Sequence, residues 1–168
     1  SGPVQLATPA GVSRIDVVSA EQMCEAALTA ATNHDIFIGC AAVADFRMAD
    51  VATQKLKKQA GSDTLTLQLV KNPDIIAQVA ALTSQRPFTV GFAAETENVA
   101  AYATQKLTQK NLDLICANDV SDPALGFNSE QNAITVYSKD GAFPLGQHSK
   151  HDLAKALISL VFEHYSQH

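Results

Sequence analysis

The chain has 168 residues, of which 46% are hydrophobic and 17% are charged, and its formal net charge is −5. This composition excludes an intrinsically disordered chain and allows one domain with a sizeable core. The negative charge argues against a general nucleic-acid or anionic-membrane binder, and no apolar run reaches the ~18 residues that a membrane-spanning helix needs.

The cysteines and the N-terminus indicate a cytoplasmic protein. Cys24, Cys40 and Cys116 are far apart and form no CxxC pair, and no basic segment followed by an apolar stretch opens the chain. Reduced thiols are therefore expected. We expect these thiols to pack as small hydrophobes, Cys40 and Cys116 within apolar strands. The histidines lack the spacing of metal ligands and are expected at the surface: His34, His148, His151, His164 and His168.

The first half of the chain alternates expected strands with expected helices. Residues 13–18 read as a short strand, and Ser19 with Gln22 resembles a capping box that opens a helix to about residue 33. Residues 36–43 form an apolar run, which is typical of a strand buried on both faces of a parallel sheet. Residues 44–62 are polar and basic, and they predict a long loop of the kind that is often functional.

The second half continues the alternation and ends in a hairpin signal. The sequence Lys139-Asp140-Gly141 predicts a turn after a strand at residues 133–137. A polar loop is expected at residues 118–132. The other expected strands are residues 65–70, 88–93 and 112–117, and the expected helices are residues 72–83, 96–111 and 150–165.

This order of elements predicts a three-layer α/β fold with a mostly parallel sheet and a C-terminal hairpin excursion. A doubly wound nucleotide-binding fold usually begins with a strand, a glycine-rich turn and a helix. None of these precedes Ser1. We therefore expect a single domain over residues 1–168 that lacks its first strand, glycine-rich loop and helix.

Several patterns are compatible with a phosphate-binding site, and each has a simpler explanation. Lys55 lies in the loop that follows a buried strand, where an ammonium group would neutralise a phosphate, although a basic loop can also be merely solvated. Pro73 opens a helix whose free N–H groups attract phosphate, or it simply starts a capped helix. Lys106 and Lys110 share a helix face that would grip a triphosphate or face solvent. Asp45 suits a ligand contact or a turn.

Taken together and in this order, the segments resemble the phosphopantothenoylcysteine synthetase family. That domain is typically the C-terminal half of a bacterial bifunctional coenzyme A biosynthesis flavoprotein. Each motif is weak alone, but the ordered set is specific and runs from Ser1 to the last helix. The matching stretches are GCAAVADF (39–46), KLKK (55–58), VKNPDI (70–75), VGFAAET (90–96), KNLDLICANDV (110–120) and GFNSE (126–130).

The resemblance implies a Rossmann-like, ribokinase-like fold and a CTP-dependent ligase. Such an enzyme joins 4′-phosphopantothenate to cysteine through an acyl-cytidylate and releases CMP and pyrophosphate. It would use Mg²⁺ that bridges the phosphates. FMN belongs only to the flavin decarboxylase domain that accompanies this domain in the full-length protein. The family also implies a homodimer, with residues 118–146 near its interface.

The resemblance also assigns roles to individual residues. Lys55 stabilises charge at the α-phosphate, while Lys106 and Lys110 hold the β- and γ-phosphates. The other implied contacts are Gly39, Cys40, Ala41 and Asp45 against the cytidine, Pro73, Asp74, Ile75 and Ile76 at a helix start, and Phe92 in the pocket wall.

The family has an upstream Gly-Gly-Thr segment that contacts the acyl group, and this chain starts after it. We therefore expect weak or absent turnover from residues 1–168 alone. Two other readings stay open at this point: a nicotinamide-dependent oxidoreductase whose glycine fingerprint is missing, and a nucleotide-binding fragment without catalysis. CTP preference would separate the ligase from the first, and product formation would separate it from the second.

Overall fold

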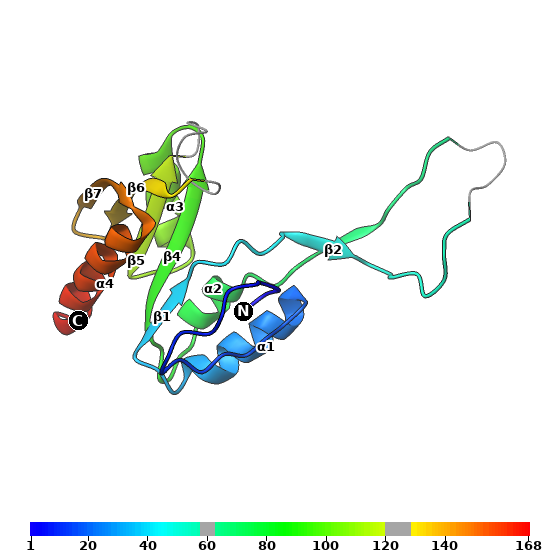
Figure 1. Ribbon diagram of the computed structural model, residues 1–168, viewed down its shortest axis with the longest axis horizontal. Helices are drawn as coiled ribbons and strands as arrows, with labels where there is room; N and C mark the ends of the chain where they lie inside the picture. The colour runs from blue at the N-terminus through cyan, green and yellow to red at the C-terminus, as the bar shows by residue number, and fades with distance from the viewer. Residues whose placement is uncertain (58–62, 120–128) are drawn as a thin grey trace. The chain divides into compact units, whose positions relative to one another are not determined.

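The computed structural model describes residues 1–57, 63–119 and 129–168 (Figure 1). They form two compact units: residues 1–26 with 42–74, here the first unit, and residues 27–41 with 75–168, here the second unit. Helix α1 (Ala20–Ala31) contributes residues to both. Within the described ranges, no helix is both long and apolar enough to cross a membrane.

The second unit is built on a five-stranded sheet with the order β1-β4-β5-β6-β7. The first three strands in this order are parallel, and β6 and β7 follow as an antiparallel hairpin. This arrangement confirms the predicted α/β fold with its C-terminal hairpin (Figure 1). The strand bounds are β1 (Ile36–Gly39), β4 (Phe88–Glu95), β5 (Leu114–Asp119), β6 (Gln131–Tyr137) and β7 (Ala142–Ser149).

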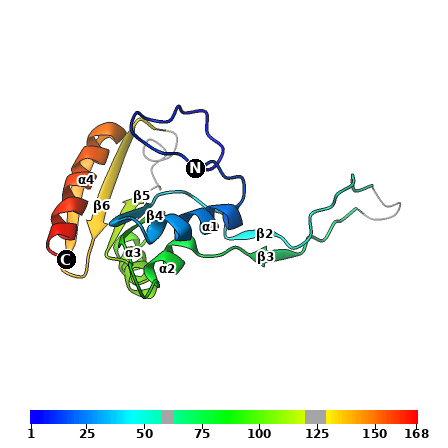
Figure 2. The same ribbon diagram turned by 90° about the horizontal axis from the view of Figure 1, so that it is seen from below.

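Helices cover both faces of this sheet, as Figure 2 shows. Helix α4 (Lys150–Ser166) lies on one face, and α2 (Ile75–Ala80) and α3 (Val99–Gln109) lie on the other. The side chains of strand β5 point alternately to the two faces. Leu114 and Cys116 belong to the core under α4, while Ile115 and Ala117 belong to the core under α2 and α3. Successive side chains of a strand point to opposite faces, so one apolar strand serves two cores.

Two glycines let α2 approach the sheet closely. Gly39 on β1 and Gly91 on β4 are direct neighbours in the parallel register. A Cβ atom on Gly39 would lie 3.0 Å from Ile76 Cδ1, and one on Gly91 would lie 3.1 Å from the same atom and 2.8 Å from Leu112 Cδ1. The side chain of Ile76 therefore occupies a notch that exists because both positions lack a Cβ.

An ion pair joins the amino ends of β4 and β5. Arg86 Nη1 lies 2.8 Å from Asp113 Oδ2, and the same oxygen accepts a hydrogen bond of 2.7 Å from the backbone N–H of Thr89. Arg86 also donates to the carbonyl oxygens of Ala80 and Asn111, at 2.9 and 2.7 Å. Both charged side chains are largely buried, so the added hydrogen bonds offset part of their desolvation cost.

The first unit contains the start of α1 and a small antiparallel ribbon. The predicted capping box is confirmed: the N–H of Gln22 donates to Ser19 Oγ at 3.1 Å, and the N–H of Ser19 donates to Gln22 Oε1 at 3.2 Å. Strands β2 (Phe46–Met48) and β3 (Leu69–Lys71) form the ribbon. Residues 50–57 and 63–68, which continue from its open end, contain no helix or strand (Figure 1).

The structure corrects three strand predictions. Residues 13–18 form no regular strand, although Val17 N donates to Ser1 O at 2.9 Å. The strand predicted for residues 36–43 ends at Gly39 and is only half buried, since β1 stands at the end of the described strand order. The strand predicted for residues 65–70 is reduced to β3, and its partner β2 lies inside the region predicted to be a loop.

One histidine also differs from its prediction. His34, His148, His151 and His168 are exposed, as expected for surface residues, but His164 is half buried. Its ring packs edge-on against Phe143 with 4.9 Å between the ring centroids, and its Nδ1 lies 3.0 Å from the carbonyl oxygen of Leu160. The aromatic neighbour on β7 makes this position part of the packing under α4.

Substituting Gly91 with alanine should destabilise the protein by about 1–3 kcal/mol, because the added methyl group overpacks the notch filled by Ile76 and Leu112. Urea unfolding followed by circular dichroism measures the loss. Gly2→Ala is the matched control, since a Cβ there meets nothing within 4 Å. Equal stability of the Gly91→Ala and Gly2→Ala proteins would show that the notch tolerates a side chain.

Candidate functional site

The carboxyl ends of the parallel strands form one edge of the sheet in the second unit. Strand β1 ends at Gly39 and β4 at Glu95, opposite Asp119 at the end of β5. Ligands of open α/β sheets bind outside this edge. The structure therefore brings several predicted site residues of the second unit to the place where a ligand is expected: Gly39, Cys40, Ala41, Ile76 and Phe92.

Cys40 is exposed, which corrects the prediction that it packs inside a strand. The chain has already left the sheet at this position, because β1 ends one residue earlier. Cys24 and Cys116 are buried as predicted. Burial raises the pKa of the Cys116 thiol to about 12, with a smaller contribution from Cys40. Cys116 is therefore a neutral packing residue at physiological pH.

Lys106 is held at this edge by a carboxylate that the sequence reading did not single out. Its Nζ lies 2.6 Å from Oε1 of Glu95, the last residue of β4. The Glu95 side chain is only 15% exposed and the Lys106 side chain 42%, so the ammonium group is fixed while still accessible. Glu95 stands in the VGFAAET stretch, but only the fold shows that it faces α3. Lys110, the C-cap residue of α3, is half buried.

The sheet separates two of the predicted contacts. Ile76 lies on the α2 and α3 face, against Gly39 and Gly91. Phe92 is half buried and packs against the core on the α4 face, because it alternates with Gly91 along β4. Ile75, at the start of α2, is also half buried. A ligand that touches both Ile76 and Phe92 would have to lie over the end of the sheet, as the topology of such folds predicts.

The remaining predicted site residues belong to the first unit. Asp45, Lys55 and Asp74 are exposed, and Pro73 is half buried. Lys58 lies outside the described residues, as do residues 120–128 of the predicted polar loop, which include part of the GFNSE match. Lys55 is thus available to a ligand, in a segment without regular structure.

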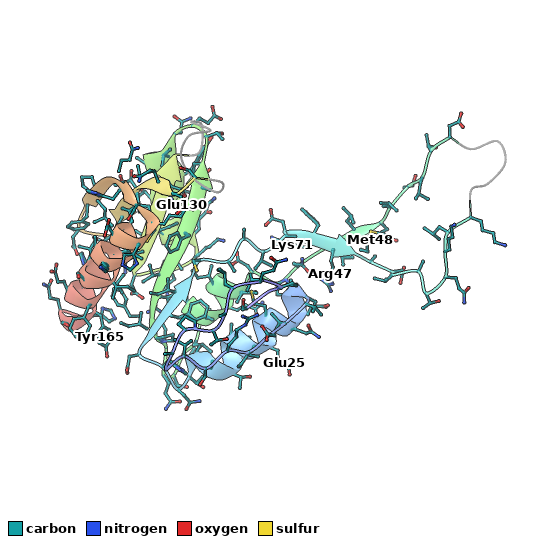
Figure 3. The ribbon with its side chains drawn as sticks, viewed as in Figure 1. Glu25, Arg47, Met48, Lys71, Glu130 and Tyr165 are labelled. Atoms are coloured by element: carbon teal, nitrogen blue, oxygen red, sulfur yellow. The ribbon has the colours of Figure 1, made fainter. Side chains whose placement is uncertain are left out.

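Arg47 organises the ribbon of the first unit, and the sequence reading missed it. Figure 3 shows it on β2, with Met48 on the same strand and Lys71 on the partner strand. Its Nη1 donates to the carbonyl oxygen of Lys71 at 2.8 Å, and its Nη2 lies 2.9 Å from Glu21 Oε1 on α1. Asn72, next to Lys71, is buried and donates to the carbonyl oxygen of Ala44 at 2.8 Å.

The chemistry available at the sheet edge suits a phosphate-bearing ligand. Two small exposed residues, Cys40 and Ala41, follow the end of β1, and Glu95 fixes the Lys106 ammonium at the end of β4. A cation that is pre-positioned by hydrogen bonding binds an anionic group with less loss of side-chain freedom.

Comparisons with known proteins identify the family of the chain. The family model described as "DNA/pantothenate metabolism flavoprotein C-terminal domain" matches residues 1–165. The coenzyme A biosynthesis bifunctional protein CoaBC of Vibrio cholerae is 58% identical over 97% of this chain and 41% of its own length. The Escherichia coli K12 protein of the same name is 54% identical over 99% of this chain and 41% of its length. The chain therefore spans about two fifths of these relatives.

Solved structures give the same result for the fold. The crystal structure of the C-terminal domain of a CoaBC protein has a TM-score of 0.79 and 31% identity, and it covers 99% of this chain and 73% of that one. The Cab2 mutant H337A in complex with phosphopantothenate-cysteine has a TM-score of 0.70 at 18% identity, covering 91% of this chain and 52% of that chain, which supports the fold alone.

The family match and the similarity to the CoaBC C-terminal domain confirm the resemblance seen in the sequence. This chain is a member of the family of DNA/pantothenate metabolism flavoprotein C-terminal domains.

Proposed function

We propose that this chain carries a CTP-dependent ligase that joins 4′-phosphopantothenate to cysteine in coenzyme A biosynthesis. The observation that carries the proposal is the Glu95–Lys106 pair at the carboxyl edge of the sheet, in a chain whose relatives are named coenzyme A biosynthesis bifunctional proteins. Ligands of open α/β sheets bind outside the carboxyl ends of the strands, so a fixed ammonium at this edge supports the proposal.

The reaction would proceed in two steps. A carboxylate oxygen of 4′-phosphopantothenate attacks the α-phosphorus of CTP, the bond to the bridging oxygen breaks, and pyrophosphate leaves. The amine of cysteine then attacks the acyl carbon of this acyl-cytidylate. An amide forms, CMP leaves, and the amine nitrogen loses a proton. Both steps develop negative charge on phosphate oxygens, which pre-positioned cations stabilise.

The residues of this chain would divide that work. Lys106 and Lys110 would hold the β- and γ-phosphates, and Lys55 would stabilise charge at the α-phosphate. Gly39, Cys40 and Ala41 would lie against the cytidine at the end of β1. The other proposed contacts of the bound nucleotide are Asp45, Pro73, Asp74, Ile75, Ile76 and Phe92.

Magnesium would be held mainly by the nucleotide. Among the described residues, no group of three or more His, Cys, Asp or Glu side chains could hold a metal ion. The chain would thus suit an ion that stays on the phosphates and keeps several waters, as Mg²⁺ usually does. It would supply further charge stabilisation there.

The proposal also includes a homodimer, a cytoplasmic location and association with a flavin decarboxylase domain.

CTP should bind more tightly than ATP, GTP or NAD, because the short residues after β1 would suit the smaller pyrimidine. It should also bind more tightly than UTP, because the cytosine amino group would donate to a carboxylate such as Asp45, which the uracil carbonyl cannot do. Isothermal titration of each nucleotide, with Mg²⁺ present, measures the order. ATP binding as tightly as CTP would contradict the assignment, and preferential NAD binding would favour an oxidoreductase.

Lys106→Ala should weaken CTP binding more than CMP binding, because CMP lacks the phosphates that this ammonium would contact. A charge-assisted contact contributes about 1.5–3 kcal/mol, or roughly 10- to 150-fold in Kd. The unpaired Glu95 would add repulsion, so Lys106→Ala with Glu95→Gln separates the two effects. Lys155→Ala on α4 removes an exposed lysine as the control. Equal losses for CTP and CMP would mean that Lys106 does not contact the phosphate tail.

Lys55→Gln should lower kcat for the ligase reaction by about 10²–10³-fold, as loss of a transition-state donor does, with a much smaller change in CTP affinity. The variant is made in this chain joined to the N-terminal part of the Vibrio cholerae relative, and product formation is followed under saturating substrates. Lys139→Gln, an exposed lysine in the hairpin turn, is the control. A kcat within threefold of that of the unsubstituted enzyme corresponds to a change of only ~0.6 kcal/mol in activation free energy. Such a result would rule out this role for Lys55.

A further inference from the structure

The segment that carries Lys55 is closed by a very short ribbon. Strands β2 and β3 have three residues each. The backbone ladder ends with Ala49 N donating to Gln68 O at 2.9 Å on one side, and with Asn72 N donating to Asp45 O at 2.8 Å on the other. An isolated two-stranded hairpin is marginally stable in water. The backbone alone therefore provides little to hold the direction of the ribbon.

Arg47 adds contacts that the ladder lacks. On β2 it stands opposite Val70, and it reaches past that residue to the carbonyl oxygen of Lys71 and, at 3.4 Å, to Asn72 Oδ1. Its other terminal nitrogen pairs with Glu21 in the first turn of α1. The planar guanidinium can serve several acceptors at fixed angles, which the single ammonium of a lysine cannot reproduce.

Asn72 completes the arrangement from the other strand. It is only 8% exposed, and its Nδ2 donates to the carbonyl oxygen of Ala44, just before β2. We call Arg47, Asn72 and Glu21 the clasp. Its contacts join the residues before β2, the residues after β3 and the start of α1. The clasp therefore fixes both strands at the base of the ribbon.

We propose that Arg47 is a positioning residue for the ligase reaction, which acts by aiming the Lys55 segment through the clasp. The inference rests on the proposed role of Lys55. Lys55 is exposed and lies in residues 50–57, which have no helix or strand, so its position depends on the direction of the ribbon base. A displacement of about 1 Å at a reacting group can cost ~100-fold in rate.

The test measures kcat and the CTP Kd of Arg47→Met in the joined enzyme described above for Lys55→Gln. Methionine keeps much of the side chain's length and removes all donors. We expect kcat to fall by roughly 10- to 100-fold while the Kd changes less than ~3-fold, because Lys55 is misplaced but the sheet edge is intact. Arg47→Lys should recover part of kcat, since it restores the charge near Glu21 without the fork.

Arg14→Met is the matched control in the first unit. Arg14 also donates to a backbone carbonyl, that of Leu6, and pairs with an aspartate, but it lies outside the ribbon. The kcat of the Arg14→Met enzyme should equal that of the unsubstituted enzyme. If Arg47→Met fails to fold, Arg47→Lys alone carries the comparison, with a smaller expected loss in kcat.

A double substitution identifies the route of the effect. In a Lys55→Gln background, Arg47→Met should cost little more, because residues that act as a unit are strongly non-additive. A full additional loss would overturn the inference, as would an unchanged kcat for Arg47→Met or a CTP Kd that rises as much as kcat falls. If Lys55→Gln itself keeps full kcat, the proposed function of Lys55 fails first, independently of any Arg47 result.

Discussion

The close approach of α2 to the sheet is the constraint on which the second unit depends. Ile76 reaches the sheet because Gly39 and Gly91 stand side by side on β1 and β4. Side chains at these two strand positions would push α2 away from the sheet and change its packing near the carboxyl edge. The glycine pair therefore sets how closely α2 packs against the sheet at the end of β1.

In each unit, an acidic side chain orients a cationic one. Glu95 holds Lys106 at the end of β4, and Glu21 helps to hold Arg47 on the ribbon. The two pairs differ in surroundings, since Glu95 is mostly buried whereas Glu21 is 58% exposed. The first pair is therefore screened less by water and orients its lysine more firmly, while the second relies on the additional carbonyl contacts of Arg47.

Some features were accessible to sequence reading because the interacting groups are close in the chain. The reciprocal bonds of Ser19 and Gln22 form within one helical turn. The turn at Lys139-Asp140-Gly141 joins two adjacent strands, closed by Ser138 N donating to Gly141 O at 2.9 Å. The apolar runs of β4 and β5 also predicted strands correctly, since strands buried on both faces require almost continuous apolar sequence.

By itself, the sequence determined the class of fold, the family, and most helices and buried strands, because these depend on local patterns and on an ordered set of motifs. Only the tertiary structure decided that β1 stops before Cys40, that β2 pairs with β3, and that Glu95 and Arg47 hold charged groups in place. Glu95 and Lys106 are 11 residues apart, and Arg47 and Lys71 are 24 apart. Contacts at such separations arise only when the sheet and the ribbon bring distant segments together, and no local propensity specifies them.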